Sequence, residues 1–308
     1  MENFRGGKAS ALGLDEPAIR ARKPDIVYAS LTAYGPRGPD YSKPGYDALI
    51  QGRTGIVSVT GTGVGAPIRA GVSIIDMGAG TWMALGIVAA LFERQRSGQG
   101  QRVDASLFQT GVMLMAYHLV YQQFTETTPL PQGSRHLSFA PYGIFATGDG
   151  TIMIGISNDR LFRRLCAALG REELAEDPRF RSNTNRVQNR DELDAMIVSL
   201  LRASPTSHWI DVFNKFDVPN DAVQNTEQVM HDPQIAALNQ LAEIALAGDH
   251  PVAVPRLPIG LAVTPAAVSG PPPQLGEHSG AILREAGYSA AEIEELVRSG
   301  VCAVRDQA

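Results

Sequence analysis

Residues 81–95, with the sequence TWMALGIVAALFERQ, constrain this chain more than any other segment. Apolar side chains surround nearly the whole helical circumference that these residues would form, which predicts a helix buried inside a core. Arg94 and Arg96 then place cations in the last turn, and Gly98 supplies a residue suited to end the helix. A chain of 308 residues is long enough for one large domain or two modest ones with such a core.

Short apolar segments before and after this helix predict strands. Residues 26–33 (IVYASLTA) are rich in β-formers and end at a cluster of glycine and proline at 34–39, which predicts a loop. Residues 56–60 predict a second short strand or turn-flanked segment, and 101–107 predict a further strand. The apolar stretch at 107–123 favours a helix.

The composition changes near residue 124, where TETTPLPQGSR reads as a polar linker. Two strands around a Gly-Asp-Gly turn at 148–150 are expected next, followed by helices at about 159–170, 190–203 and 206–216. This pattern predicts a small α+β domain. Residues 250–275 are rich in proline, and the C-terminal region predicts two short helices, the second with a capping box between Ser289 and Glu292.

Composition and motifs exclude several classes of protein. Twenty-seven Lys and Arg against 32 Asp and Glu give a net charge of −5, which argues against a general nucleic-acid binder. No run of about 18 apolar residues predicts a membrane span, and no secretory signal is recognisable at the start. Cys166 and Cys302 are far apart and predict reduced thiols of a cytoplasmic protein. The six histidines lack zinc-binding spacing, so no metal site is expected.

Asp76 lies at the entrance of the apolar helix and is the first candidate for chemistry. A carboxylate at a helix N-terminus suits an N-cap, and it equally suits a carboxylate nucleophile that is charged and partly desolvated. Gly78 and Gly80 leave the helix entrance bare. Because glycine destabilises a helix, either substrate access or close helix packing is expected to account for them.

Two basic segments precede Asp76, and residues 1–75 hold nine Lys and Arg against six Asp and Glu. Asn3, Phe4 and Arg5 form a polar, aromatic and basic cluster that could stack an adenine and pair with a phosphate, or could be a frayed terminus. Lys43 and Tyr46 follow the proline-rich loop, which could line a ligand site or could form turns only.

A dinucleotide-type pattern, Gly61-x-Gly63-x-x-Ala66, follows the 56–60 segment. Such a fingerprint requires a helix directly after it, and Pro67 and Gly71 interrupt one here. The pattern therefore favours a glycine-rich turn over a nicotinamide or flavin site.

An ordered set of segments across nearly the whole chain resembles the family III CoA-transferases, also called the CaiB/BaiF family. The matching segments are ENFRGG, LGL at 12–14, KPDIVYASLTAYGPRGP, GYDALIQ, TG at 54–55 and 60–61, Asp76 with Gly80, ALFERQRSGQGQRVDASL, PYGIFATGDG, DPRF and GEHSGAILREAGYSAAEI. By this resemblance, members of the family carry about 90 residues before the position of Met1, holding the first half of a Rossmann-like domain.

The resemblance implies an α/β fold with a Rossmann-like large domain, incomplete at its N-terminus, and a smaller α+β domain. Residues 1–125 and 250–308 would form the large CoA-binding domain and residues 126–249 the small one, in an interlocked homodimer. The partners implied are an acyl-CoA donor and a carboxylic acid acceptor, without nucleic acid, membrane, metal or redox cofactor.

The resemblance also assigns roles to residues. Asp76 would be the nucleophile that passes through a covalent aspartyl-CoA thioester. Asn3, Phe4 and Arg5 would contact CoA, with Lys43 close to a CoA-contacting stretch and Tyr46 in the substrate pocket. Backbone N–H groups near Gly78 and Gly80 are expected to stabilise the oxyanions.

Two alternatives remain open at this point. The first is an α-methylacyl-CoA racemase of the same family, which pairs the aspartate with a histidine about thirty residues upstream as a second acid–base group. This chain has Tyr46 there and no histidine in residues 1–117. The second is an inactive truncated fragment or a scaffold for a partner.

Overall fold

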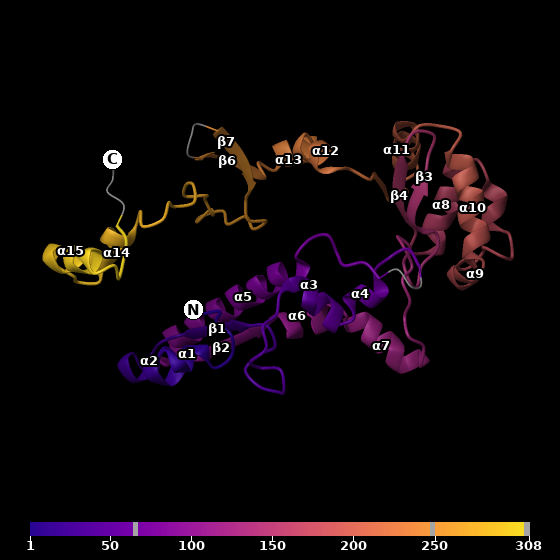
Figure 1. Cartoon of the computed structure of the whole chain (residues 1–308). Helices are drawn as coiled ribbons and strands as arrows, with labels where there is room; N and C mark the ends of the chain where they lie inside the picture. Colours follow the sequence, from indigo (N-terminus) through magenta and orange to yellow (C-terminus); the bar gives the residue numbers. More distant parts are fainter. Residues whose placement is uncertain (64–66, 247–249, 305–308) are drawn as a thin grey trace. The chain divides into compact units, whose positions relative to one another are not determined.

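The computed structural model describes residues 1–63, 67–246 and 250–304 and shows a mixed α/β protein (Figure 1). Contacts between Cα atoms divide it into two compact units, Met1–Val223 and the residues from Gln224 onward. The expected division into a large domain of residues 1–125 and 250–308 and a small domain of residues 126–249 stays a prediction.

A parallel pair of strands, β1 (Tyr28–Thr32) and β2 (Arg102–Ser106), organises the N-terminal part of the first unit. Ser30 lies opposite Asp104, and the chain between the strands forms a helical crossover, as parallel strands require. Both predicted strands are therefore confirmed, each slightly shorter than expected. The helices of this part are α1 (Lys8–Ala11), α2 (Glu16–Arg22), α3 (Asp47–Arg53), α4 (Ile56–Val59), α5 (Ile74–Ser97), α6 (Leu107–Leu114) and α7 (Ala116–Thr125).

The helix α4 corrects the expectation of a strand at 56–60. Gly55 adopts a left-handed conformation with φ of 89°, which turns the chain directly before Ile56. Ile56 then enters a small core, and this tertiary contact outweighs the β-preference of the sequence IVSVT. The core consists of Ile50, Ile56, Ile75, Ala79, Leu107 and Met115.

The apolar helix α5 is longer and less buried than the sequence predicts. It begins at Ile74, and Gly98 ends it with φ of 71°, as expected. One face packs on β1, β2, α3 and α6. Among the residues that the structure describes, the other face of α5 exposes large apolar side chains to solvent. The expectation of a helix buried on all sides is therefore wrong. These side chains are Trp82, Leu85, Val88 and Phe92.

By length and composition α5 could cross a membrane, since an 18-residue window has a mean hydropathy of 1.7. The core helix of a globular protein meets the same criteria, and 22% of this window is buried. The expectation of no membrane span stays a prediction.

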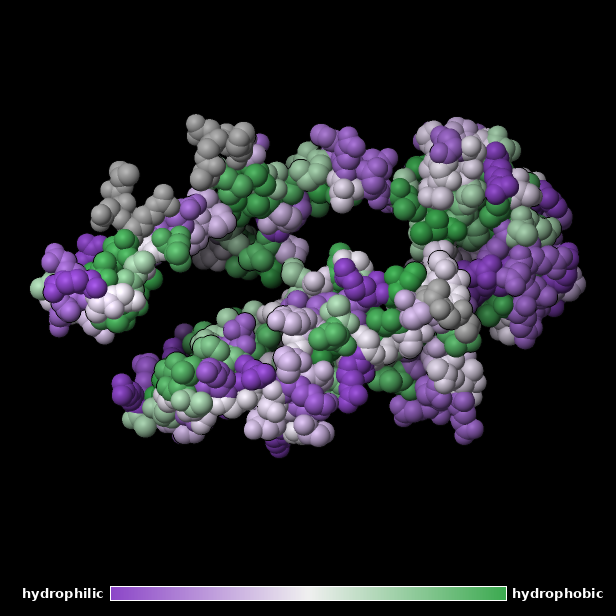
Figure 2. Space-filling view, viewed as in Figure 1, coloured by the Kyte–Doolittle hydropathy of each residue, from purple (hydrophilic) through white to green (hydrophobic). Residues whose placement is uncertain are grey.

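A separate core forms around the three-stranded antiparallel sheet of β3 (Tyr142–Ala146), β4 (Thr151–Gly155) and β5 (Asn220–Ala222). The expected hairpin around residues 148–150 is confirmed, as are the helices predicted there. The predicted helices are α8 (Asp159–Ala168), α10 (Arg190–Leu201) and α11 (Thr206–Lys215). The structure adds α9 (Asn183–Gln188) and a 3₁₀ turn at Glu172–Ala175, which the sequence analysis did not predict. In Figure 2 the surface over α8 to α10 is mostly hydrophilic, while Phe162, Phe180 and Phe213 fill the interior.

The second unit contains short elements. These are α12 (Thr226–Met230), α13 (Pro233–Ala237), the hairpin of β6 (Leu241–Leu246) and β7 (His250–Pro255), and the helices α14 (Ser279–Glu285) and α15 (Ala290–Arg298). The predicted capping box is confirmed, because Ser289 and Glu292 bond each other's backbone N–H groups at the start of α15.

Candidate active site

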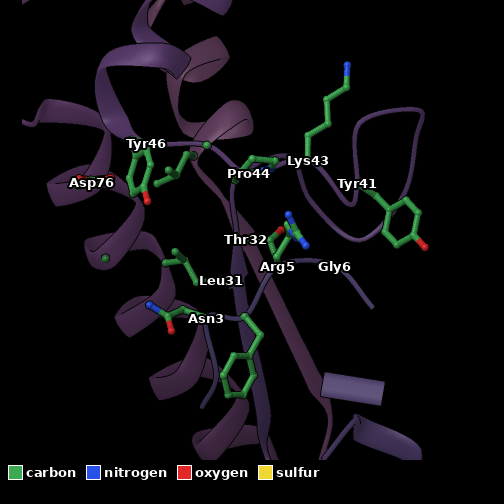
Figure 3. Close-up of a pocket in the computed structure, with 15 residues that line it drawn as sticks. Asn3, Arg5, Gly6, Leu31, Thr32, Tyr41, Lys43, Pro44, Tyr46 and Asp76 are labelled. Carbon is green, nitrogen blue, oxygen red and sulfur yellow. The ribbon is translucent and has the colours of Figure 1, made fainter. Parts of the chain in front are cut away.

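A pocket of about 470 Å³ lies where β1 and β2 end and α5 begins. Carboxyl ends of parallel strands are the usual place for ligands in α/β folds, because the chain leaves the sheet there in loops. The pocket brings together all six side chains that the sequence analysis singled out, and Figure 3 shows five of them by label. Its lining residues are Asn3, Phe4, Arg5, Gly6, Leu31, Thr32, Ala33, Tyr41, Lys43, Pro44, Gly45, Tyr46, Asp76, Gly80 and Leu107.

Pairing of Glu2 with β1 carries the next three residues into the pocket. The Glu2 N–H donates to the Ala29 carbonyl at 2.9 Å, and the Leu31 N–H donates to the Glu2 carbonyl at 3.1 Å. The chain therefore runs beside β1 and leaves the sheet at the same end. Asn3 and Arg5 flank the end of β1 in Figure 3, so this segment is held by the sheet and is no frayed terminus.

The loop between β1 and α3 supplies the opposite wall. A methyl group at Gly45 would lie 2.6 Å from Ala33 Cβ, so only glycine lets this loop approach β1 so closely. Lys43 pairs with Asp40, and this ion pair holds the pKa of the Asp40 carboxyl below its usual value. Tyr46 precedes α3 and is 75% exposed, so its ring faces the open pocket.

Asp76 lies in the first turn of α5, and the interpretation of this residue as the N-cap is wrong. Ser73 holds the N-cap position, and its side chain makes no capping bond. The capping carboxylate comes instead from Asp47, whose Oδ2 accepts the N–H groups of Ile75 at 2.9 Å and Asp76 at 3.1 Å. The Asp76 side chain is therefore free of a capping role and lies at the pocket wall.

Two effects raise the pKa of Asp76. Partial burial against the pocket wall removes water from the carboxyl and acts most strongly, and the negative charge of Asp47 adds to it. Both effects destabilise the anion, which makes the carboxylate a better nucleophile once it is ionised.

The sequence analysis missed Asp47 and Gln51, which position Asp76 without lining the pocket. Asp47 is 6% exposed and Gln51 is fully buried. The Gln51 side-chain amide donates to Asp47 Oδ1, while its Oε1 accepts the Ala70 N–H at 2.8 Å. The spacing of four residues between the two on one helix face was the signal available in the sequence.

The backbone N–H groups of Gly78 and Gly80 are not available as the expected oxyanion donors. Both residues lie inside α5, where each N–H donates to the carbonyl four residues earlier. The N–H groups of the first turn are also occupied, because Ile74 and Met77 donate to Val72 and Ser73. Gly80 lines the pocket, whereas Gly78 packs against α6.

In the part of the chain that the structure describes, neither a metal site nor the dinucleotide-type glycine pattern is supported as a binding site. Within the described ranges, no three His, Cys, Asp or Glu residues are grouped so that they could hold a metal ion. Of the dinucleotide-type pattern, Gly61 and Gly63 lie in a bend, and Ala66 lies outside the described residues.

The chain matches known proteins both in sequence and in fold. The sequence profile of CoA-transferase family III matches residues 1–279. The chain therefore belongs to CoA-transferase family III.

Individual relatives agree with this assignment. The chain is 35% identical to an acyl-CoA transferase of Fusarium pseudograminearum over 98% of its own length and 66% of that protein. It is 36% identical to an acetyl-CoA:oxalate CoA-transferase of Acetobacter aceti, over 78% of this chain and 62% of that protein. A human succinyl-CoA:glutarate CoA-transferase is 31% identical over 98% of this chain and 69% of that protein. The chain thus spans about two thirds of the length of these relatives.

Solved structures show the same fold. A CaiB/BaiF family protein from Brucella suis superimposes with a TM-score of 0.78 at 32% identity, covering 92% of this chain and 74% of that one. Rv3272 from Mycobacterium tuberculosis gives a TM-score of 0.81 at 29% identity, covering 91% of this chain and 74% of that one.

Proposed function

We propose that this protein transfers CoA from an acyl-CoA donor to a carboxylic acid acceptor, with Asp76 as the covalent nucleophile. The observation that supports this most is the placement of Asp76. Its carboxyl lines a pocket at the carboxyl ends of two parallel strands, and Asp47 has taken over the capping role. The names of the relatives support CoA transfer as the reaction class.

The proposed reaction proceeds through four displacements. Asp76 attacks the thioester carbon of the donor, which releases CoA thiolate and leaves an aspartyl–acyl anhydride. The thiolate attacks the aspartyl carbonyl and releases the donor acid, which leaves an aspartyl-CoA thioester. The acceptor carboxylate attacks this thioester and releases the thiolate again, giving a second anhydride. The thiolate then attacks the acceptor acyl carbon, which forms the new acyl-CoA and regenerates the Asp76 carboxylate.

The remaining pocket residues are proposed to bind the CoA part of the substrate. Arg5 and Lys43 would attract its anionic phosphates, and Phe4, which is 40% exposed, offers a ring for stacking. Asn3 adds an amide that can donate and accept hydrogen bonds. The reaction needs no cofactor besides the CoA thioester, and we propose a cytoplasmic homodimer as the working form.

Mass spectrometry after incubation with acyl-CoA tests the proposal. We expect a covalent adduct on the peptide that contains Asp76, and we expect Asp76→Asn to abolish it. Asp211→Asn is the matched control, because Asp211 is an exposed helical carboxylate on α11 outside the pocket. A folded wild-type protein that forms no adduct would refute the proposed function.

Exchange of the α-proton in deuterated water distinguishes a racemase. A racemase needs a second acid–base group beside the α-carbon, and the histidine that the racemases of this family place there is replaced by Tyr46. We therefore expect acyl transfer without α-exchange. Rapid exchange without transfer would favour the racemase instead.

A further inference from the structure

The three glycines of α5 have different surroundings. A methyl group at Gly86 would lie 2.7 Å from Val103 Cγ1, and one at Gly78 would lie 3.0 Å from Thr110 Cγ2. Close packing therefore accounts for both. A methyl group at Gly80 would meet no atom within 4 Å. Because an interior helical glycine is less stable than alanine by about 1 kcal/mol, Gly80 needs an explanation other than packing.

The position of Gly80 relative to Asp76 supplies that explanation. Gly80 follows Asp76 by four residues, so both lie on one face of α5, and both line the same pocket. Bonds from Cα to Cβ in a helix tilt towards its N-terminus, so a side chain covers the turn before its own Cα. A side chain at position 80 would therefore occupy the pocket space beside Asp76, which the acyl group of a substrate has to enter.

We infer that Gly80 is a specificity-determining residue, whose missing side chain keeps Asp76 open to acyl groups that are bulky next to the thioester carbonyl. This inference rests on the proposed function. The carboxylate oxygen must approach the thioester carbon to about 3–3.5 Å before the bond forms. The open face at Gly80 leaves room for an α-substituent during this approach, with the apolar side chains of Leu31 and Leu107 lining the same pocket.

The test compares Gly80→Ala and Gly80→Val with the same substitutions at Gly52. Gly52 is a matched control, because it lies in helix α3, a methyl group there would also meet no atom within 4 Å, and it does not line the pocket. We expect Gly80→Ala and Gly52→Ala both to raise the melting temperature. Only the position-80 variants are expected to slow acylation, by about 10-fold for alanine and about 100-fold for valine.

Three acyl-CoA thioesters of increasing bulk next to the carbonyl test the specificity. In Gly80→Ala the rate of adduct formation should fall more steeply from acetyl-CoA to propionyl-CoA to isobutyryl-CoA than in the wild type. An equal loss for all three thioesters, or no loss in Gly80→Val, would overturn the inference.

A second readout depends only on access to Asp76 and not on CoA transfer. A water-soluble carbodiimide with an added amine modifies exposed carboxyls, and we expect Gly80→Val to reduce labelling of Asp76 several-fold relative to Asp211. Gly52→Val should leave this ratio unchanged. If the wild type forms no adduct with acyl-CoA, the proposed function fails, and the labelling ratio still decides whether position 80 controls access. Unchanged labelling in Gly80→Val would overturn the inference.

Discussion

Removal of the Asp47 carboxylate should destabilise the start of α5, which carries Asp76. In the native protein Asp47 accepts two backbone N–H groups of α5 through Oδ2 and the Gln51 amide through Oδ1. Asp47→Ala removes the side-chain acceptor of the Ile75 and Asp76 N–H groups, and it leaves the Gln51 amide with only the distant Val72 carbonyl at 3.5 Å. We therefore expect a large loss in the free energy of unfolding.

The contacts of Asp47 set the size of this loss. Losing a capping side chain costs about 1–2 kcal/mol, and each further buried donor left unpaired costs about 1–3 kcal/mol. With the Gln51 amide as the one further donor, we expect Asp47→Ala to lose about 2–5 kcal/mol in total. Asp47→Asn should lose less, about 1–2 kcal/mol, because its carbonyl oxygen can still accept from the helix. Its amino group must then face the Gln51 amino group, since Ala70 holds the Gln51 Oε1.

Urea unfolding followed by tryptophan fluorescence measures these differences, with Asp211→Ala as the surface control. Trp82 lies in α5, and a Trp209→Phe background leaves it as the only tryptophan, so that the signal reports on this helix. An Asp47→Ala protein within about 0.5 kcal/mol of the wild type would refute the reasoning, because surface substitutions have effects of that size. A carboxyl NMR titration adds a second readout: the pKa of Asp76 should fall in Asp47→Asn, since one of the two effects that raise it is removed.

Three further predictions concern single side chains. Because the folded state raises the pKa of Asp76 above its usual 3.8, ionised Asp76 destabilises the protein as pH rises through that pKa. Urea unfolding should therefore show Asp76→Asn more stable than wild type at pH 7, with the difference disappearing below pH 3.8. Arg186 is fully buried and donates to the buried carbonyls of Ala140 and Phe180, so Arg186→Leu should lower the free energy of unfolding by about 2–6 kcal/mol in the same assay. Burial raises the pKa of the Cys166 thiol to about 12, so a thiol reagent at pH 8 should modify Cys302 and reach Cys166 only on unfolding.

Local sequence patterns predicted much of the secondary structure. Three of these predictions depend only on residues that are close together in the sequence. They are the end of α5 at Gly98, the hairpin around residues 148–150 and the capping box of Ser289. The strand expected at 56–60 is a helix, because the turn at Gly55 and burial of Ile56 outweigh the local preference. Likewise, because apolar residues surround α5 on all sides, the sequence does not predict which face of this helix packs against the strands and helices next to it.

The sequence by itself determined that the chain resembles CoA-transferase family III and that Asp76 is the candidate nucleophile, because both depend on residue types in a fixed order. Only the tertiary structure decided what surrounds that carboxyl. The capping bond joins Asp47 to a backbone 28 and 29 residues away, and the difference between Gly78 and Gly80 depends on Thr110 of another helix. Hydrogen bonds and steric contacts between distant segments exist only after the chain has folded, so no local pattern contains them.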